Sequence, residues 1–286
     1  MRLATLQTPQ GPRAVVRQGE SYIDINATDS SLPNSVREWL AQNLLSQVAA
    51  VAVKTGAKSF PVRGAQFHAP IPDPQKVICI GLNYSDHAAE QNLQPPKEPV
   101  VFSKFVTALT GHEKPVELPS VSTKVDYEAE LVVVIGKGGR MIAEADGMKH
   151  VAGYMVGHDV SARDWQKEKD GKQWLCGKTF DTFAPCGPEF ITADEVNDPH
   201  ALPIRLRLNG TVMQDSNTNK LIFSIPRLIS YISQVFTLTP GDLIFTGTPP
   251  GVGDARKPPV YMKPGDIAEV EIEGLGLLRN TMVEGR

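Results

Sequence analysis

The chain has 286 residues, with 29 lysines and arginines against 32 aspartates and glutamates, so its formal net charge is −3. This balance supplies no general positive field, and we expect neither nucleic acid nor an anionic membrane surface as a partner. Hydrophobic residues make up 41% of the chain and charged residues 21%, which is typical of a globular protein. The three cysteines have no framework spacing, which argues against a disulfide scaffold and favours a reducing compartment.

The N-terminal segment, MRLATLQTPQGPRAVVRQGE, lacks the apolar core of a secretory signal. No stretch approaches the roughly 18 uncharged apolar residues that a membrane span needs. We therefore expect a cytoplasmic protein, or a mitochondrial matrix protein if a presequence was removed from a eukaryotic precursor.

Residues 1–68 are predicted to form a small N-terminal α/β unit. Apolar residues recur every three or four positions from Val36 to Val51, with Pro33 before them and Gly56 after them, and this spacing predicts one amphipathic helix. Before this helix, strand-like segments are predicted at residues 3–6, 14–17 and 22–25. After it, prolines interrupt the pattern, and we place a domain boundary between residues 68 and 69.

The second domain, residues 69–286, is predicted to be mostly β. A helix is expected at residues 225–235, with Pro226 in its first turn, and two Pro-Gly-Asp triplets predict type II turns at Gly241 and Gly265. The strands do not alternate with long helices, so the predicted fold is α+β, a mixed β-roll or sandwich rather than a doubly wound sheet. Apolar runs predict buried strands at residues 77–81, 131–135 and 243–246, and alternation predicts a half-buried strand at residues 269–273.

Three carboxylates stand next to these apolar runs. Glu128 and Glu130 are two positions apart before a buried strand, so on an extended chain they point to the same face. Like charges at the edge of a core repel unless a cation or a shared proton relieves them. Asp159 ends another strand-like run. Three oxygen ligands without a cysteine or histidine pair favour a hard cation, Mg²⁺ or Mn²⁺, over zinc.

The same spacing also fits a simpler arrangement. Glu128 and Glu130 would then lie on the solvated face of an edge strand, with Tyr127 and Ala129 packed inward. The continuous apolar run after Glu130 argues against this alternative but does not settle the choice.

Basic and amide side chains follow Asp159. Arg163 and Gln166 are three positions apart, so on a helical turn they share a face and could bind a carboxylate together. Lys178 follows in an apolar, aromatic-bounded setting, where it could pair with the charge of a substrate. For each of these residues a surface salt bridge is the simpler alternative.

His87 and Glu90 follow a predicted buried strand at a separation of three residues. At a helix start this spacing lets the glutamate orient the imidazole, as a general base requires. A surface or capping histidine is the simpler alternative. The proline-bearing tract at residues 94–99 suits a loop that acts as a lid.

The segment from Thr246 to Gly253 combines glycines, prolines and two hydroxyls. It lacks the Gly-Lys-Ser/Thr ending of a nucleotide phosphate loop, so we exclude that function. Gly247 and Thr248 could present donors to a substrate carboxylate, and a plain structural turn is an equal alternative.

Taken in chain order, these motifs resemble those of the fumarylacetoacetate hydrolase family. The resemblance covers about residues 76–272. Within the family, the chain looks closest to the second type of fumarylacetoacetate hydrolase domain-containing protein. It rests on Gly-x-Asn-Tyr-x-x-His from Gly81 to His87, Glu-x-Glu-Leu from Glu128 to Leu131, Asp-x-Ser-Ala-Arg-Asp-x-Gln from Asp159 to Gln166, Lys178, and Thr-Gly-Thr-Pro from Thr246 to Pro249.

The resemblance implies a homodimer with Mg²⁺ or Mn²⁺ as cofactor, with Ca²⁺ as a substitute, held by Glu128, Glu130 and Asp159. It implies that a 2-oxo acid binds this metal through its carboxylate and keto oxygens. The implied roles of the remaining residues are catalysis for His87, Glu90 and Lys178 and substrate binding for Arg163, Gln166, Thr248 and Gly247.

From the resemblance and the His87–Glu90 pair we expect a metal-dependent enzyme of small 2-oxo dicarboxylates. The leading activity is oxaloacetate keto–enol tautomerisation, with decarboxylation as an accompanying reaction. Hydrolysis of C–C bonds in acylpyruvates or fumarylacetoacetate is the alternative in the same class. A protein that binds a metal and a keto acid without turnover is the alternative from another class.

Overall fold

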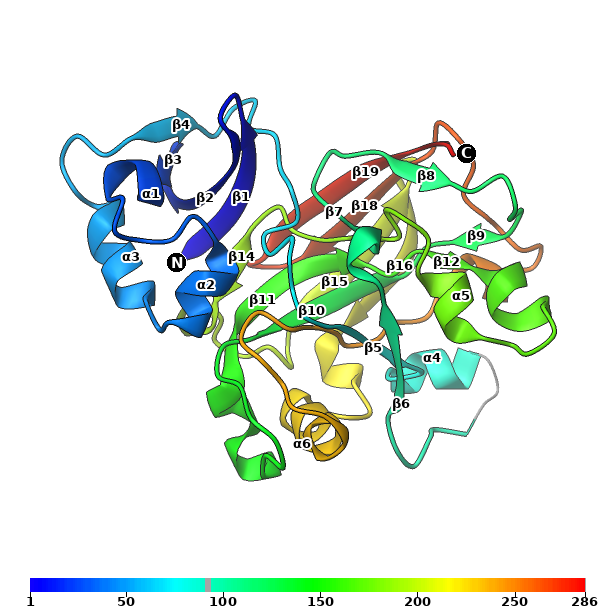
Figure 1. Cartoon of the computed structure of the whole chain (residues 1–286). Coiled ribbons are helices and arrows are strands. Elements are labelled where there is room, and N and C mark those ends of the chain that lie inside the picture. The colour runs from blue at the N-terminus through cyan, green and yellow to red at the C-terminus, as the bar shows by residue number, and fades with distance from the viewer. Residues whose placement is uncertain (91–93, 286) are drawn as a thin grey trace.

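Mixed β-sheets form the framework of the protein in a computed structural model that describes residues 1–90 and 94–285 (Figure 1). The larger sheet runs in the order β4 (Ser59–Pro61), β3 (Ser21–Asp24), β2 (Gly11–Gln18), β1 (Arg2–Thr8), β14 (Phe190–Thr192), β11 (Val151–His158), β10 (Ala129–Ile135), β17 (Leu243–Phe245), β5 (Val77–Gly81) and β6 (Val100–Lys104). The second sheet runs β16 (Thr211–Asn217), β15 (Pro203–Leu208), β18 (Ile267–Ile272), β19 (Gly276–Glu284) and β8 (Val116–Leu118).

Two short strand pairs complete the sheets, β12 (Ser161–Ala162) with β9 (Val125–Asp126) and β13 (Ala184–Pro185) with β7 (Leu109–Thr110). The helices that matter below are α2 (Val36–Ala41), α3 (Leu45–Ala52), α4 (Ser85–Glu90), α5 (Trp174–Lys178) and α6 (Ile225–Val235). None of the helices in the described residues is both long and apolar enough to cross a membrane.

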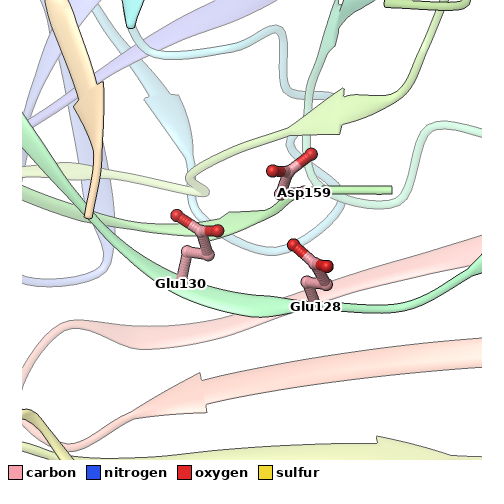
Figure 2. A group of neighbouring side chains, drawn as sticks. All are labelled: Glu128, Glu130 and Asp159. Atoms are coloured by element: carbon pink, nitrogen blue, oxygen red, sulfur yellow. The ribbon is translucent and has the colours of Figure 1, made fainter. Parts of the chain in front are cut away.

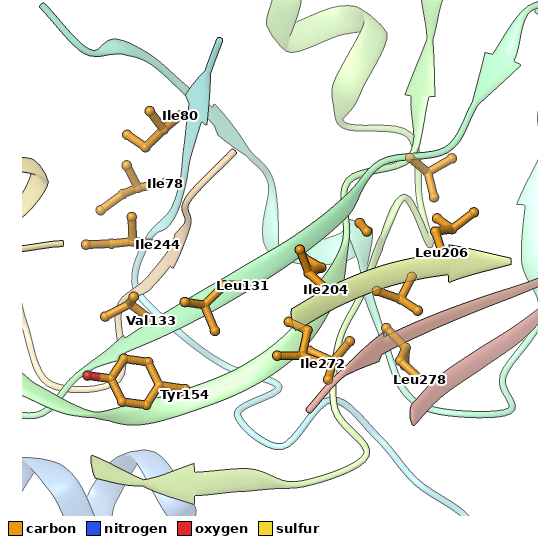
Figure 3. Packing of buried hydrophobic residues seen from close by; sticks show 14 of the residues in the cluster. Ile78, Ile80, Leu131, Val133, Tyr154, Ile204, Leu206, Ile244, Ile272 and Leu278 are labelled. Atoms are coloured by element: carbon orange, nitrogen blue, oxygen red, sulfur yellow. The ribbon is translucent and has the colours of Figure 1, made fainter. Parts of the chain in front are cut away.

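The central strands of the larger sheet are buried on both faces. Alternate residues of β10 point in opposite directions, so Leu131 and Val133 join one core while Val132 and Val134 join another. In the first core, Leu131 and Val133 lie across from Ile204 and Ile272 of the second sheet (Figure 3). This arrangement confirms the predicted mixed, strand-rich fold and the predicted buried strands at residues 77–81, 131–135 and 243–246.

The first strands of the chain continue the larger sheet. β1 pairs antiparallel with β14, with Arg2 opposite Ile191 and Leu3 opposite Phe190. The second core also joins Trp39 and Val48 from the N-terminal helices to residues of β10 and β17. The predicted division at residues 68 and 69 stays a prediction.

The single helix predicted between Val36 and Val51 is wrong, because the structure has two helices there, α2 and α3. Asn43 has a φ of +55°, a left-handed conformation that a continuous helix cannot contain. The apolar spacing continues across the break because both helices bury residues in the second core, so spacing alone does not reveal the break.

Other local predictions are confirmed. The helix with Pro226 in its first turn is α6, and the half-buried strand predicted at residues 269–273 is β18. In the two Pro-Gly-Asp turns, Gly241 and Gly265 have φ values of +86° and +92°, as the third position of a type II turn requires.

Asn83 connects three segments beside α4. Its side-chain amide donates to the carbonyls of Thr246 and Phe223 at 2.8 and 3.2 Å, and its carbonyl oxygen accepts from the Phe223 N–H at 2.8 Å. The residue is fully buried, so water cannot replace these partners.

We predict that Asn83→Ala lowers the free energy of unfolding by about 2–4 kcal/mol, because buried amide and carbonyl groups lose their partners. Urea unfolding measures the change, and Asn197→Ala, at an exposed position, is the control with an expected change below about 0.5 kcal/mol. Equal unfolding midpoints for the two variants would show that Asn83 does not join these segments.

Candidate active site

The antiparallel pairing of β10 with β11 brings the three carboxylates together. Glu130 is opposite Gly157, and beyond the strand end the Asp159 N–H donates to the Glu128 carbonyl at 2.9 Å. Glu128 and Glu130 point to the same face, and the Asp159 side chain lies beside them on the neighbouring chain segment (Figure 2). One oxygen from each side chain lies within 4.8 Å of the others.

All three carboxylates are buried, so the solvated edge-strand alternative is wrong. Glu128, Glu130 and Asp159 are 6%, 1% and 0% exposed. Burial raises the pKa of Glu130 well above its usual range, and the charges of Asp159 and Glu128 raise it further. Burial also acts to raise the pKa of Glu128, but the charges of Lys178 and Arg163 outweigh it and lower that pKa below its usual range.

Two buried ammonium groups contact Asp159 from either side. Lys178 donates to Oδ2 of Asp159 at 2.9 Å and to Oε2 of Glu128 at 2.8 Å. Nζ of Lys104 lies 2.7 Å from Oδ1 of Asp159 but donates its hydrogens to the carbonyls of Val160, Phe183 and Lys178. Oδ1 of Asp159 is therefore buried without a hydrogen-bond donor.

A divalent cation fits this group of side chains. The donors are all carboxylate oxygens, which hard cations prefer, and Oδ1 of Asp159 accepts no hydrogen bond in addition to its ion pair with Lys104. Burial, and then the charges of Asp159 and Glu128, raise the pKa of Glu130, and a cation between the carboxylates would offset these effects.

Arg163 is fixed by carboxylates rather than exposed at the surface. Its Nη2 lies 2.7 Å from both Asp126 and Glu128, and its Nε donates to Asp126 at 2.8 Å. Its Nη1 donates to Oε1 of Gln166 at 3.0 Å, which confirms that Arg163 and Gln166 share a face. The surface salt-bridge alternative is wrong for both Arg163 and Lys178, which are 5% and 2% exposed.

A cavity of about 200 Å³ opens beside the carboxylates. It is smaller than the roughly 300–1,000 Å³ of pockets for drug-sized ligands, so it suits a small molecule. Glu128, Gln166 and Lys178 supply polar groups to its wall, and Phe102 and Trp174, in edge-to-face contact at 5.4 Å, supply an aromatic side.

His87 and Glu90 form the predicted pair on α4. Nδ1 of His87 lies 3.2 Å from Oε2 of Glu90, and the imidazole lines the cavity. Glu90 also accepts from the Gly251 N–H at 3.0 Å, which joins α4 to the turn after β17. The predicted lid at residues 94–99 is irregular in structure, and its movement stays a prediction.

The turn after β17 also contains Gly247 and Thr248. The Gly247 N–H donates to Oε2 of Glu130 at 2.8 Å, so this amide supports a carboxylate of the acidic group rather than pointing at the cavity. Gly247 has a φ of +103°, and an added Cβ would lie 2.8 Å from the Cβ of Asn83. Thr248 lines the cavity and accepts from Nε2 of Gln214 at 2.9 Å.

Asp126 and Lys104 are parts of the site that the sequence did not assign. Asp126 accepts from Gly253 and Asp254 N–H groups at 2.7 and 3.0 Å, in addition to its contact with Arg163. Its position two residues before Glu128 was an available signal. Lys104, at the end of an alternating strand, carried no signal, because its partners are mostly backbone carbonyls from distant segments.

The chain matches the family described as "Fumarylacetoacetate (FAA) hydrolase C-terminal" over residues 76–283. It therefore belongs to the fumarylacetoacetate hydrolase family, as the ordered motifs predicted. "Oxaloacetate tautomerase FAHD2A, mitochondrial" from Bos taurus is 50% identical over 288 residues, covering 99% of this chain and 92% of the relative. "Oxaloacetate tautomerase fahd2, mitochondrial" from Xenopus laevis is 48% identical over 288 residues, covering 99% and 90%.

Solved structures show the same fold. The fumarylacetoacetate hydrolase of Exiguobacterium antarcticum is 32% identical with a TM-score of 0.86, and the alignment covers 100% of both chains. The maleylpyruvate hydrolase of Sphingobium sp. SYK-6, in complex with manganese(II) ion and pyruvate, is 32% identical with a TM-score of 0.82, again over 100% of both chains.

We predict that Asp126→Asn lowers the free energy of unfolding by about 3–5 kcal/mol, because the buried Arg163 loses part of its compensating charge. Asp215→Asn is the matched control, since Asp215 pairs with Arg205 at 2.9 Å on the exposed surface and should cost less than about 1 kcal/mol. Chemical unfolding of both variants measures the difference. Similar costs would mean that burial does not strengthen the contribution of Asp126.

Proposed function

We propose that this chain is a metal-dependent enzyme that interconverts the keto and enol forms of a small 2-oxo dicarboxylic acid, with oxaloacetate as the substrate. The observation that carries the proposal is a buried group of three carboxylates beside a small cavity lined by Lys178 and His87. The identity of 48–50% to relatives named oxaloacetate tautomerases, over 99% of this chain, supports the choice of substrate.

Glu128, Glu130 and Asp159 would hold Mg²⁺ or Mn²⁺, with Ca²⁺ as a substitute. When bound, such a cation supplies Lewis-acid polarisation of a substrate carbonyl oxygen. The name of the Sphingobium structure, with manganese(II) and pyruvate, supports both the metal and the 2-oxo acid.

The basic side chains make the site compatible with an anionic substrate. Three ionised carboxylates and one divalent cation leave a net negative charge, which repels a dicarboxylate. Lys178 offsets this charge at the cavity wall, where it contacts Glu128 and Asp159. Because Arg163 is already held by Asp126 and Glu128, we expect it to act by its charge and by orienting Gln166. Gln166 and Thr248 would then contact the substrate.

Tautomerisation moves a proton between carbon 3 and the adjacent carbonyl oxygen, so it needs a base near that carbon. Burial lowers the pKa of His87 despite the opposing charges of Glu128 and Glu90, which favours the neutral imidazole. The contact of Nδ1 with Glu90 favours the tautomer with the proton on Nδ1 and the lone pair on Nε2. His87 would take the proton from carbon, and its partner Glu90 would stabilise the imidazolium.

Hydrolysis of a C–C bond in an acylpyruvate is the second candidate. The likeness to a maleylpyruvate hydrolase favours it. Its reaction needs an attacking water, whereas tautomerisation needs only proton transfer, so the two reactions are separated by their products.

The experiment follows the ultraviolet absorbance of enol-oxaloacetate with purified protein, with Mg²⁺ or EDTA, while pyruvate is assayed. Rapid metal-dependent loss of the enol without matching pyruvate is the expected result. Stoichiometric pyruvate would instead identify decarboxylation. If no condition accelerates enol loss, acylpyruvate cleavage is tested next, and inactivity there too would leave a binding protein.

The homodimer and the cellular location stay predictions. The word mitochondrial in the names of both relatives favours a mitochondrial location over a cytoplasmic one.

We predict that His87→Ala lowers kcat by about 10²- to 10⁴-fold, the usual contribution of a general base, while Mn²⁺ affinity is unchanged. Glu90→Gln should cause a smaller loss. The control is His68→Ala, because His68 contacts Gln7 in the N-terminal region and should not affect turnover. Wild-type turnover of His87→Ala would remove the base assignment.

We also predict that Glu130→Gln and Asp159→Asn each weaken Mn²⁺ binding by more than the roughly 10- to 100-fold that loss of an outer-shell partner causes. Electron paramagnetic resonance of free Mn²⁺ during titration of the protein measures the affinity. Glu117→Gln, at an exposed carboxylate, is the control. Undiminished affinity in either acidic-group variant would exclude that residue as a ligand.

A further inference from the structure

Lys104 is enclosed next to the acidic group without lining the cavity wall that Lys178 forms. Lys104 is 3% exposed and lies at the end of β6, the edge strand of the larger sheet. Its ammonium donates to the carbonyls of Val160 at 3.0 Å, Phe183 at 2.8 Å and Lys178. The three ammonium hydrogens are thus directed by backbone atoms, which fixes the position of the charge.

The three carbonyls belong to segments that carry the site. Val160 follows Asp159, and Lys178 ends α5. Phe183 lies beyond α5, and its carbonyl also accepts from the Val160 N–H at 3.1 Å. One buried cation therefore holds the backbone on which Asp159 and Lys178 stand.

The Asp159 carboxylate lies between two cations with different environments. Lys104 is 2.7 Å from Oδ1, and Lys178 is 2.9 Å from Oδ2. The Lys178 ammonium donates to two side-chain carboxylates and lies over the Phe102 ring, 5.2 Å from its centroid, so these partners are side chains that can move with it. The Lys104 ammonium is held by main-chain atoms, so it is the fixed reference for the orientation of Asp159.

We propose that Lys104 is a positioning residue that orients Asp159 and the Lys178 backbone for binding of a divalent cation. The proposal rests on the proposed metal-binding role of Glu128, Glu130 and Asp159. Lys104 itself would contact neither the metal nor the substrate. Its loss should therefore weaken metal binding by the amount typical of an outer-shell partner, about 10- to 100-fold.

The test is Mn²⁺ titration of metal-free wild type and Lys104→Met, followed by electron paramagnetic resonance, with thermal unfolding in parallel. Lys76→Met is the matched control, because Lys76 also pairs with a buried carboxylate, Asp242, at 3.0 Å. Both variants should lower the melting temperature. Only Lys104→Met should raise the Mn²⁺ dissociation constant, by at least about tenfold.

Each other outcome has a definite meaning. Wild-type protein that does not bind Mn²⁺ would overturn the metal site itself, and Lys104→Met with wild-type affinity would overturn only the role of Lys104. Equal weakening in Lys104→Met and Lys76→Met would also overturn it, because general destabilisation would then explain the loss.

If Lys104→Met does not fold, Lys104→Arg takes its place. The planar guanidinium keeps the charge but cannot reproduce the contacts of one ammonium with three carbonyls. It should weaken Mn²⁺ binding by at least about threefold, less than loss of the whole outer-shell partner. Wild-type affinity of a folded Lys104→Arg would overturn the requirement for this geometry.

Discussion

The burial of three carboxylates within 4.8 Å of one another is the constraint on which the rest of the site depends. Removing these charges from water is costly, and their mutual repulsion adds to the cost. The fold places Lys104, Lys178 and Arg163 around them, each buried and each in contact with at least one carboxylate of the group. Each of these contacts offsets part of the cost of burying the carboxylate charges.

The compensating charges come from segments far apart in the sequence. Lys104 ends β6, Arg163 follows β12, and Lys178 ends α5. Because these three cations contact Glu128 and Asp159 from three different segments, the contacts also join those segments to the central strands β10 and β11. Electrostatic compensation and the assembly of the cavity wall are therefore the same set of contacts.

The proposed chemistry follows from what lies on either side of the acidic group. Buried cations surround the carboxylates, while the proposed base, His87, stands on the short helix α4 and is joined to the turn after β17 through Glu90. Proteins with this acidic group can differ in the cavity and in the access of water while the carboxylates stay the same. For this reason the same site geometry is compatible with either a tautomerase or a C–C hydrolase.

The sequence alone determined the local features of this protein. Apolar runs predicted the buried strands, and the i, i+2 spacing predicted the shared direction of Glu128 and Glu130, because side chains alternate along a strand. The Pro-Gly-Asp triplets predicted turns, because proline and glycine have distinct φ preferences. Tertiary structure decided the helix break at Asn43, the burial of both glutamates, and the roles of Asp126 and Lys104. It also decided that Asp159 meets Glu128, since strand register and contacts between distant segments set these features and a shift of one residue would turn the side chains to the other face.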